Sequence, residues 1–182
     1  TSVPQRAQDL AKAKQLLAAA GHSSGVSTTL VTEEYQEIPA LAQVIQQAAA
    51  QIGVTIKLKV ATQTAYYGKS TYGNSDWLDG AMSLVDYGDR GVPNVFLEAP
   101  LTSGGPWNAA HFRNKAYDAL VKQYVASVDL QTQKALAGKI ETLLLAQTPI
   151  VIPYFIDGLT ATTSIVHGVN PASISAIYPK DA

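Results

Sequence analysis

The sequence predicts an α/β fold in which a mixed, mostly parallel sheet is flanked by helices, with residues 1–182 forming a single domain. The first observation is that two β-branched stretches, 26–32 and 54–60, enclose a helical pattern over 38–52, which makes a βαβ unit. The second is that further helical and β-rich patterns follow in the second half of the chain. The third is that 182 residues, of which 47% are hydrophobic and 15% charged, suit one globular domain.

Apolar spacing predicts the elements of the first half. A stripe of hydrophobic residues predicts a helix over 4–21, which Pro4 could open. In 54–60, hydrophobic and polar residues alternate, which is typical of a strand with one solvated face. The tyrosine-rich stretch 62–73 predicts one or two helical turns, and the apolar run 81–85 predicts a short buried strand.

The second half begins with an irregular stretch and ends in helices and β-rich segments. Residues 86–112 are dominated by Gly, Pro, Asn and Asp, and an irregular stretch of this length is usually functional or a crossing between lobes. Two long helices are expected to begin at Asn114 and Asp129, which are both good capping residues. Strands are expected over 150–156, where an internal proline indicates an edge or a bulge, and over 160–166, before a loop-like tail.

Charge and composition exclude several classes of protein. The chain has 13 basic and 14 acidic residues and no basic stripe, which argues against a nucleic-acid partner. No apolar run is long enough to span a membrane. With no cysteine, disulfides, thiolate metal sites and a thiol nucleophile are excluded. The sequence starts at Thr1 without a leader or a lipid-accepting cysteine, so either processing or excision of a domain is expected.

The residue types that carry catalysis form no recognised pattern. His22, His111 and His167 are far apart in sequence, without metal-ligand spacing, and are expected to be surface or hydrogen-bonding residues. The chain has no phosphate-binding loop, nucleophile elbow or dinucleotide fingerprint. The sequence therefore predicts no enzyme, no cofactor and no metal. A hydrolase that uses Asp86 and Asp89 as an acid–base pair is a minor alternative, because one glycine-rich loop is a poor scaffold for two convergent carboxylates.

The strongest local signal for a binding site is the segment DWLDGAMSLVDYGDRGVPNVF. Its predicted strand delivers Asp86 and Tyr87 to the carboxyl end, where ligands gather in open α/β sheets. An ionised Asp86 could bind an ammonium group, or could equally satisfy backbone amides of a turn. Tyrosines in the predicted loops, with Trp77 and Trp107, suit a site that encloses a partly apolar ligand, although each tyrosine could instead pack at the rim of the core.

Five motifs then resemble, in order, those of the solute-binding proteins of ABC importers, family 5, which includes dipeptide-, oligopeptide- and nickel-binding proteins. They cover nearly all of residues 9–168. They are DLAKAKQLLAAAGH, VIQQAAAQIGVTIKLKV, VDYGDRGVPNVFL, FRNKAYDALVKQYVASVD and KIETLLLAQTPIVIPYF.

The resemblance implies a fold, partners and a location. The chain corresponds to the C-terminal lobe of a two-lobed protein with a periplasmic-binding-protein class II fold, whose lobes close around the ligand. The implied partners are a peptide or other small solute, the N-terminal lobe of the same protein and an ABC permease. The implied location is extracytoplasmic, with anchoring through a lipid attached upstream. A ligand-sensing domain of a receptor or regulator built on the same fold is the alternative.

The resemblance also points to site residues. Asp86 stands where peptide binders of the family hold the amino terminus of the ligand, so binding is favoured over the turn. Ser83 stands where the family has a tryptophan, and no arginine precedes it, which argues against free dipeptides and leaves longer peptides, capped solutes, sugars or metal chelates. The expected site consists of Asp86, Tyr87 and Ser83, with Trp107 and Asn108 as loop contacts.

Overall fold

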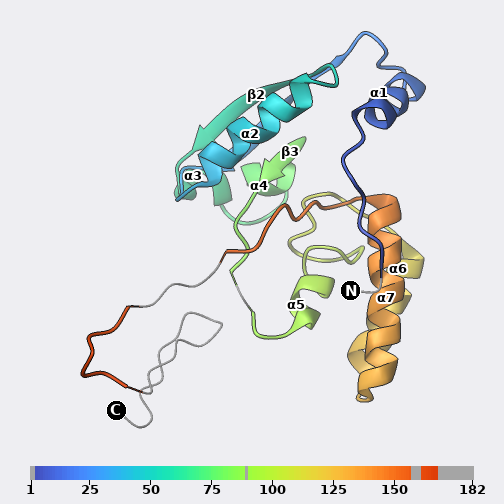
Figure 1. Cartoon of the computed structure of the whole chain (residues 1–182), viewed down its shortest axis with the longest axis vertical. Helices are drawn as coiled ribbons and strands as arrows, with labels where there is room; N and C mark the ends of the chain where they lie inside the picture. Colours follow the sequence, from blue (N-terminus) through green and yellow to red (C-terminus); the bar gives the residue numbers. More distant parts are fainter. Residues whose placement is uncertain (1–2, 89, 157–160, 168–182) are drawn as a thin grey trace. The chain divides into compact units, whose positions relative to one another are not determined.

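A computed structural model describes residues 3–88, 90–156 and 161–167 and divides the chain into two compact units (Figure 1). The first unit ends at Asp86 and the second begins at Tyr87. Each unit contains a hydrophobic cluster of its own. None of the described helices is long and apolar enough to cross a membrane.

The first unit is built on a three-stranded parallel sheet in the order β2-β1-β3. The central strand β1, Val26–Glu33, pairs along its whole length with β2, Val54–Ala61. On its other side it pairs with the short strand β3, Met82–Leu84, where Val31 lies opposite Ser83. The predicted α/β fold with a parallel βαβ unit is confirmed.

One helix covers this sheet and provides its core. The helix α2, Ile38–Ala50, lies along the sheet (Figure 1), and its Ala42 packs with Leu30 of β1 and Ile56 of β2. All three side chains are buried, and Val54 and Leu58, two positions before and after Ile56, pack against the same cluster, so alternate positions of β2 face the helix. The third strand is less buried than predicted, since Met82 is 37% exposed and only one neighbouring strand covers β3 in the described sheet.

The first helix begins later than the sequence predicts. The helix α1 spans Leu10–Ala19, and the carboxylate of Asp9 accepts a hydrogen bond from the backbone N–H of Lys12 at 2.8 Å. This bond satisfies one of the free N–H groups at the start of the helix and so determines where the helix begins. The predicted opening at Pro4 is therefore wrong.

The second unit packs α6, Lys115–Ala126, against α7, Leu130–Gln147 (Figure 1). Both helices begin as predicted: Asn114 accepts hydrogen bonds from the first N–H groups of α6, and Asp129 accepts from Thr132 in α7. The bonds from the hydroxyl and then the N–H of Thr132 lower the pKa of Asp129. The buried cluster between the helices consists of Leu101, Tyr117, Val121 and Ile140.

Two predicted strands are absent from the described part of the second unit. Residues 150–156 form no strand, and neither do the described residues of 160–166, which are 161–166. These predictions are wrong for the described residues because a β-rich segment becomes a strand only when a partner offers backbone hydrogen bonds. Residue 160 and the predicted loop-like tail from 168 onward lie outside the described residues.

The buried Tyr117 makes the stability of the second unit depend on pH. Its side chain has no exposed surface, and its hydroxyl donates a hydrogen bond to the carbonyl of Leu97 at 2.8 Å. Burial, with a smaller contribution from the negative charge of Asp118, raises the pKa of Tyr117 above the ordinary value of 10.0. The unfolded chain therefore releases this proton at a lower pH than the folded chain.

We expect this contribution to stability to be complete below about pH 10 and to be lost as the pH rises further. The free energy of unfolding, measured with urea from about pH 8 to about pH 11, should fall more steeply in the wild type than in Tyr117→Phe. The other tyrosines are common to both proteins and cancel in this difference. If the free energy of unfolding falls equally with pH in the wild type and in Tyr117→Phe, the raised pKa of Tyr117 does not contribute to stability.

Candidate ligand-binding site

The carboxyl end of β3 is held by two hydroxyl groups. The hydroxyl of Tyr66, in the short helix α3 (Gln63–Tyr67), donates a hydrogen bond to the carbonyl oxygen of Leu84 at 2.9 Å. The Oγ1 of Thr32 donates to the same oxygen at 3.3 Å. Both donors are 0% exposed, so the core fixes their positions. Since Asp86 follows two residues after Leu84, these bonds determine where the chain leaves the sheet.

Asp86 lies in solvent at this end of the sheet. Its side chain is exposed, and no described residue forms a hydrogen bond or an ion pair with its carboxylate. Asp9 and Asp129, by contrast, accept backbone N–H groups at the starts of helices. The turn role that the sequence left open for Asp86 is therefore not observed among the described residues, and its carboxylate is accessible to a ligand.

Ser83 lies in β3, half-buried and opposite Val31. It is the third residue before Asp86 and belongs to the paired part of the strand, whereas Asp86 lies beyond it. The partner proposed for Asp86 in a hydrolase, Asp89, lies outside the described residues. Among the residues described, no group of three or more His, Asp or Glu side chains could hold a metal ion.

Aromatic side chains and one arginine gather at the start of the second unit. The rings of Tyr87 and Phe96 meet edge to face with centroids 5.9 Å apart, and the centroid of Tyr87 is 6.3 Å from that of Trp107. The guanidinium carbon of Arg90 lies 5.9 Å from the centroid of the Trp107 ring, within cation–π range. Tyr87 and Trp107, both predicted site residues, therefore lie close together. Arg90 was missed because its surroundings, GDRG, indicate only a turn.

Asn108 is buried, with an exposed fraction of 2%. Its amide nitrogen donates to the carbonyls of Thr102 at 3.0 Å and of Phe112 at 2.7 Å, and its amide oxygen accepts from the N–H of Phe112 at 2.9 Å. Because both amide protons are donated within the loop, the side chain positions the loop that carries Trp107. The ligand contact predicted for Asn108 stays a prediction, and the burial of the side chain argues against it.

The stretch 86–112 is more ordered than its composition predicts. It contains the short helix α5, Pro93–Glu98, which begins with proline at its first position, where no N–H is needed. Ser103 is held by Asp118 of α6, whose carboxylate accepts its N–H at 2.9 Å and its hydroxyl at 2.6 Å. Side-chain clamps from a regular element therefore stabilise a loop that lacks regular structure.

A carboxylate at the end of β1 is buried, which the sequence patterns do not predict. Glu33 is 1% exposed, and its oxygens accept hydrogen bonds from the hydroxyl of Tyr67 and the amide nitrogen of Gln63, both at 2.8 Å. Thr32 pairs with Leu84 in the parallel strands β1 and β3. Glu33 and Asp86, which follow these two residues in sequence, therefore lie at the same carboxyl end of the sheet. The sequence around Glu33 does not distinguish it from a solvent-exposed glutamate, because its hydrogen-bond donors, Gln63 and Tyr67, come from a different segment.

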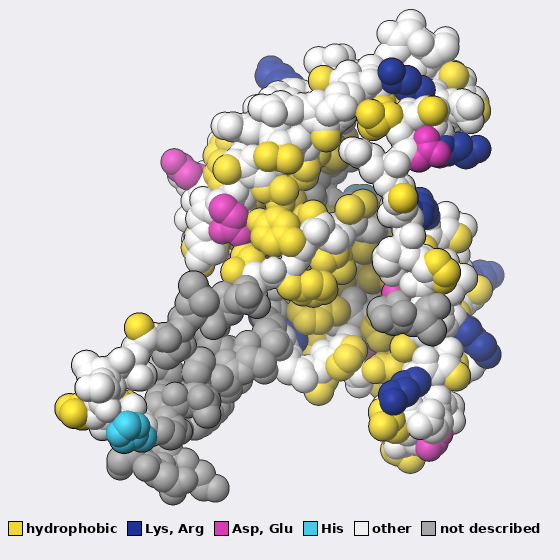
Figure 2. Space-filling view, viewed as in Figure 1, with side chains coloured by type: hydrophobic (Ala, Val, Ile, Leu, Met, Phe, Trp, Pro, Cys, Tyr) yellow, Lys and Arg dark blue, Asp and Glu magenta, His cyan; other side chains and the backbone are white. Residues whose placement is uncertain are grey.

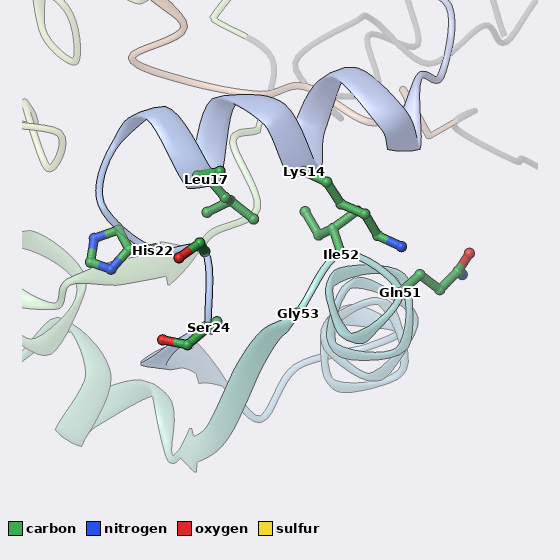
Figure 3. Close-up of a pocket in the computed structure, with 10 residues that line it drawn as sticks. Lys14, Leu17, His22, Ser24, Gln51, Ile52 and Gly53 are labelled. Carbon is green, nitrogen blue, oxygen red and sulfur yellow. The ribbon is translucent and has the colours of Figure 1, made fainter.

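A pocket of about 350 Å³ in the first unit lies at the other end of the strands, where β1 and β2 begin (Figure 3). Lys14 and Leu17 project into it from α1 toward Ile52, at the end of α2. Gly25 and Gly53, which also line the pocket, directly precede β1 and β2. Ligands of open α/β sheets bind at the carboxyl ends of the strands, so the end that carries Asp86 is the candidate site.

The fold is that of bacterial solute-binding proteins. It is similar to the structure of DppA, an ABC transporter-associated periplasmic binding protein of Helicobacter pylori in complex with the peptide STSA, with a TM-score of 0.65 and 26% identity. This similarity covers 78% of the present chain and 28% of that structure. The family model for bacterial extracellular solute-binding proteins, family 5 Middle, matches residues 1–108. The chain belongs to this family, as its motifs indicated.

Two curated relatives agree with this membership. The chain is 30% identical over 163 residues to the dipeptide-binding protein DppE of Bacillus subtilis, covering 87% of the chain and 29% of the relative. It is 31% identical over 149 residues to the periplasmic murein peptide-binding protein MppA of Escherichia coli, covering 79% of the chain and 26% of the relative. The chain thus spans less than a third of the length of these relatives.

Proposed function

We propose that residues 1–182 are the C-terminal ligand-binding lobe of a longer solute-binding protein, which binds peptides or similar small solutes for an ABC importer. Family membership and the peptide named with the similar H. pylori protein support the ligand class. The proposed partners are the N-terminal lobe and the permease in the membrane. The proposed location is extracytoplasmic, with a lipid anchor outside this chain, and the protein binds its ligand without chemical change.

The observation that carries the proposal is the carboxylate of Asp86, which is exposed and has no partner among the described residues, at the carboxyl end of a core-anchored strand. A carboxylate in this position can accept a charge-assisted hydrogen bond from the ammonium group at the amino terminus of a peptide. Because Tyr66 and Thr32 hold the strand end before the ligand arrives, little backbone ordering is required on binding. Ser83, Tyr87 and Trp107 are proposed as further lining residues.

Replacing Asp86 by Ala in the full-length protein is expected to weaken peptides with a free amino terminus by about 1.5–3 kcal/mol, or roughly 10- to 150-fold in Kd. Asp86→Asn should lose a similar amount, since the amide keeps the shape and removes the charge. Peptides acetylated at the amino terminus should bind the wild type and both variants equally. Isothermal titration calorimetry with matched free and acetylated tripeptides measures all of these affinities.

Glu98→Ala is the matched control, since it removes an exposed carboxylate from the helix α5 and should leave every affinity unchanged. If Asp86→Ala binds free-amine peptides as tightly as the wild type, Asp86 does not belong to the site. If the folded wild-type protein binds none of the peptides, the proposed class of solute is wrong.

A further inference from the structure

The side chain of Arg90 is held at two points in the second unit. Its guanidinium carbon lies 5.9 Å from the centroid of the Trp107 ring, and its Nη1 donates a hydrogen bond to the carbonyl of Gly88 at 3.1 Å. A guanidinium placed over an indole ring is attracted by the negative face of that ring. These contacts restrict the charged end of an exposed side chain that would otherwise sample many rotamers.

The loop that carries Trp107 is itself fixed. The backbone N–H of Trp107 donates to the carbonyl of Ala99 at 2.9 Å, and its carbonyl accepts from the N–H of Ala109 at 2.7 Å. The next residue, Asn108, is buried and donates both of its amide protons within the loop. Trp107 is half-buried, so the ring on which Arg90 lies is in place before a ligand arrives.

The chemistry of an arginine in this position favours a carboxylate as its ligand. The guanidinium is charged at every physiological pH, and its N–H donors form a planar fork that matches the two oxygens of a carboxylate. Arg90 is exposed, so a ligand can approach it from solvent. Because its charged end is already restricted by Trp107 and Gly88, less side-chain entropy is lost when a ligand binds.

A general positive field does not provide the same preference. The chain has 13 basic and 14 acidic residues. On the face of the described residues that Figure 2 shows, the Lys and Arg side chains are scattered and form no basic patch. Recognition of a carboxylate would therefore depend on one placed guanidinium, which a single substitution can remove.

We propose that Arg90 binds a carboxylate of the solute and so determines which peptides the protein prefers. This inference rests on the proposed function and deepens it, since Asp86 binds the ammonium group and Arg90, four residues later in the sequence, binds a carboxylate of the same ligand. That carboxylate is either the carboxyl terminus of a short peptide or an acidic side chain within it. The lack of an arginine just before Ser83 therefore does not exclude ligands with a free carboxylate.

Isothermal titration calorimetry of the full-length protein with four tripeptides tests this assignment. Ala-Ala-Ala is compared with its carboxyl-terminal amide, and the amide of Ala-Glu-Ala with the amide of Ala-Gln-Ala. The first pair reports on a terminal carboxylate and the second on an acidic side chain, while all four keep the free amino terminus. In at least one pair, the wild type is expected to bind the carboxylate roughly 10-fold or more tightly than the neutral peptide.

Substitutions assign this preference to a residue. Arg90→Gln should abolish the preference and leave the affinity for the neutral peptides unchanged. Arg90→Lys keeps the charge but not the planar fork, so it should retain part of the preference. Arg113→Gln is the matched control, because it removes another exposed arginine of the second unit and should leave the preference as it is in the wild type.

The outcomes separate this inference from the proposed function. A wild type without preference in either pair, or a preference that survives Arg90→Gln, would overturn the role of Arg90. Equal weakening of charged and neutral peptides by Arg90→Gln would also overturn it, since Arg90 would then only support the Trp107 ring. If Asp86→Ala still weakens free-amine peptides in these cases, the proposed function stands and the role of Arg90 alone fails. A folded wild type that binds none of the peptides would refute both.

Discussion

Replacing Tyr117 by Ala is expected to lower the free energy of unfolding of the second unit by about 3–5 kcal/mol. Tyr117 has no exposed surface and packs with Val121 and Ile140 between α6 and α7. Its ring also meets that of Phe112 with centroids 5.6 Å apart. Truncation would leave a cavity among these side chains. It would also remove the hydroxyl that donates a hydrogen bond to the carbonyl of Leu97, so the packing and the hydrogen bond would be lost together.

Urea unfolding of the full-length protein measures the loss of unfolding free energy. Hydrogen exchange of the amides of residues 115–126 shows whether the loss is in the second unit. Tyr117→Phe keeps the ring and removes only the hydroxyl, so it should cost about 1 kcal/mol. Equal losses for the Ala and Phe variants would show that the hydroxyl, and not the packing of the ring, accounts for the effect. A loss spread evenly over both units would show that they do not unfold separately.

Replacing Glu33 by Ala is expected to lower the free energy of unfolding of the first unit by about 1–3 kcal/mol. The substitution leaves the hydroxyl of the half-buried Tyr67 and the amide of the exposed Gln63 without their shared acceptor. The loss of an acceptor by a partly buried donor such as the Tyr67 hydroxyl costs about 1–3 kcal/mol, whereas the exposed amide of Gln63 can bond water instead. Part of the cost is offset because a buried charge is also removed.

Glu34→Ala is the matched control for Glu33→Ala, because the neighbouring glutamate is exposed. It should change the free energy of unfolding by no more than about 0.5 kcal/mol. Thermal or urea unfolding of the two variants, read out by exchange of the amides of β1, compares them directly. If the variants are equally stable, the bonds of Glu33 contribute nothing net to the fold.

The elements that the sequence predicts correctly are those whose signals are local. The alternation in 54–60 sets the strand β2 through side-chain period alone, and Asn114 marks the start of α6 through a bond to its own next turn. The helix at 4–21 was predicted too long because Pro4 was taken as its start, although the apolar stripe begins only at Leu10. Asp9 decides the start through one hydrogen bond that periodicity does not reveal.

The site was predictable only in part, for the same reason. The position of Asp86 follows from strand order and family resemblance, but its lack of a described partner is a tertiary property. Asn108 is polar and lies in a loop, which indicates exposure, yet it is buried because two carbonyls from its own loop converge on its amide. Residues 150–156 have the composition of a strand, but composition does not supply a neighbouring strand.

The carbonyl of Leu84 accepts two hydroxyl donors that come from different elements, Thr32 in β1 and Tyr66 in α3. A carbonyl oxygen has two lone pairs, so if one donor is lost by mutation the other still satisfies the acceptor. The end of β3 therefore stays bonded when either Thr32 or Tyr66 is replaced. The residues that follow Leu84 can therefore change without loss of the bond that holds the end of β3.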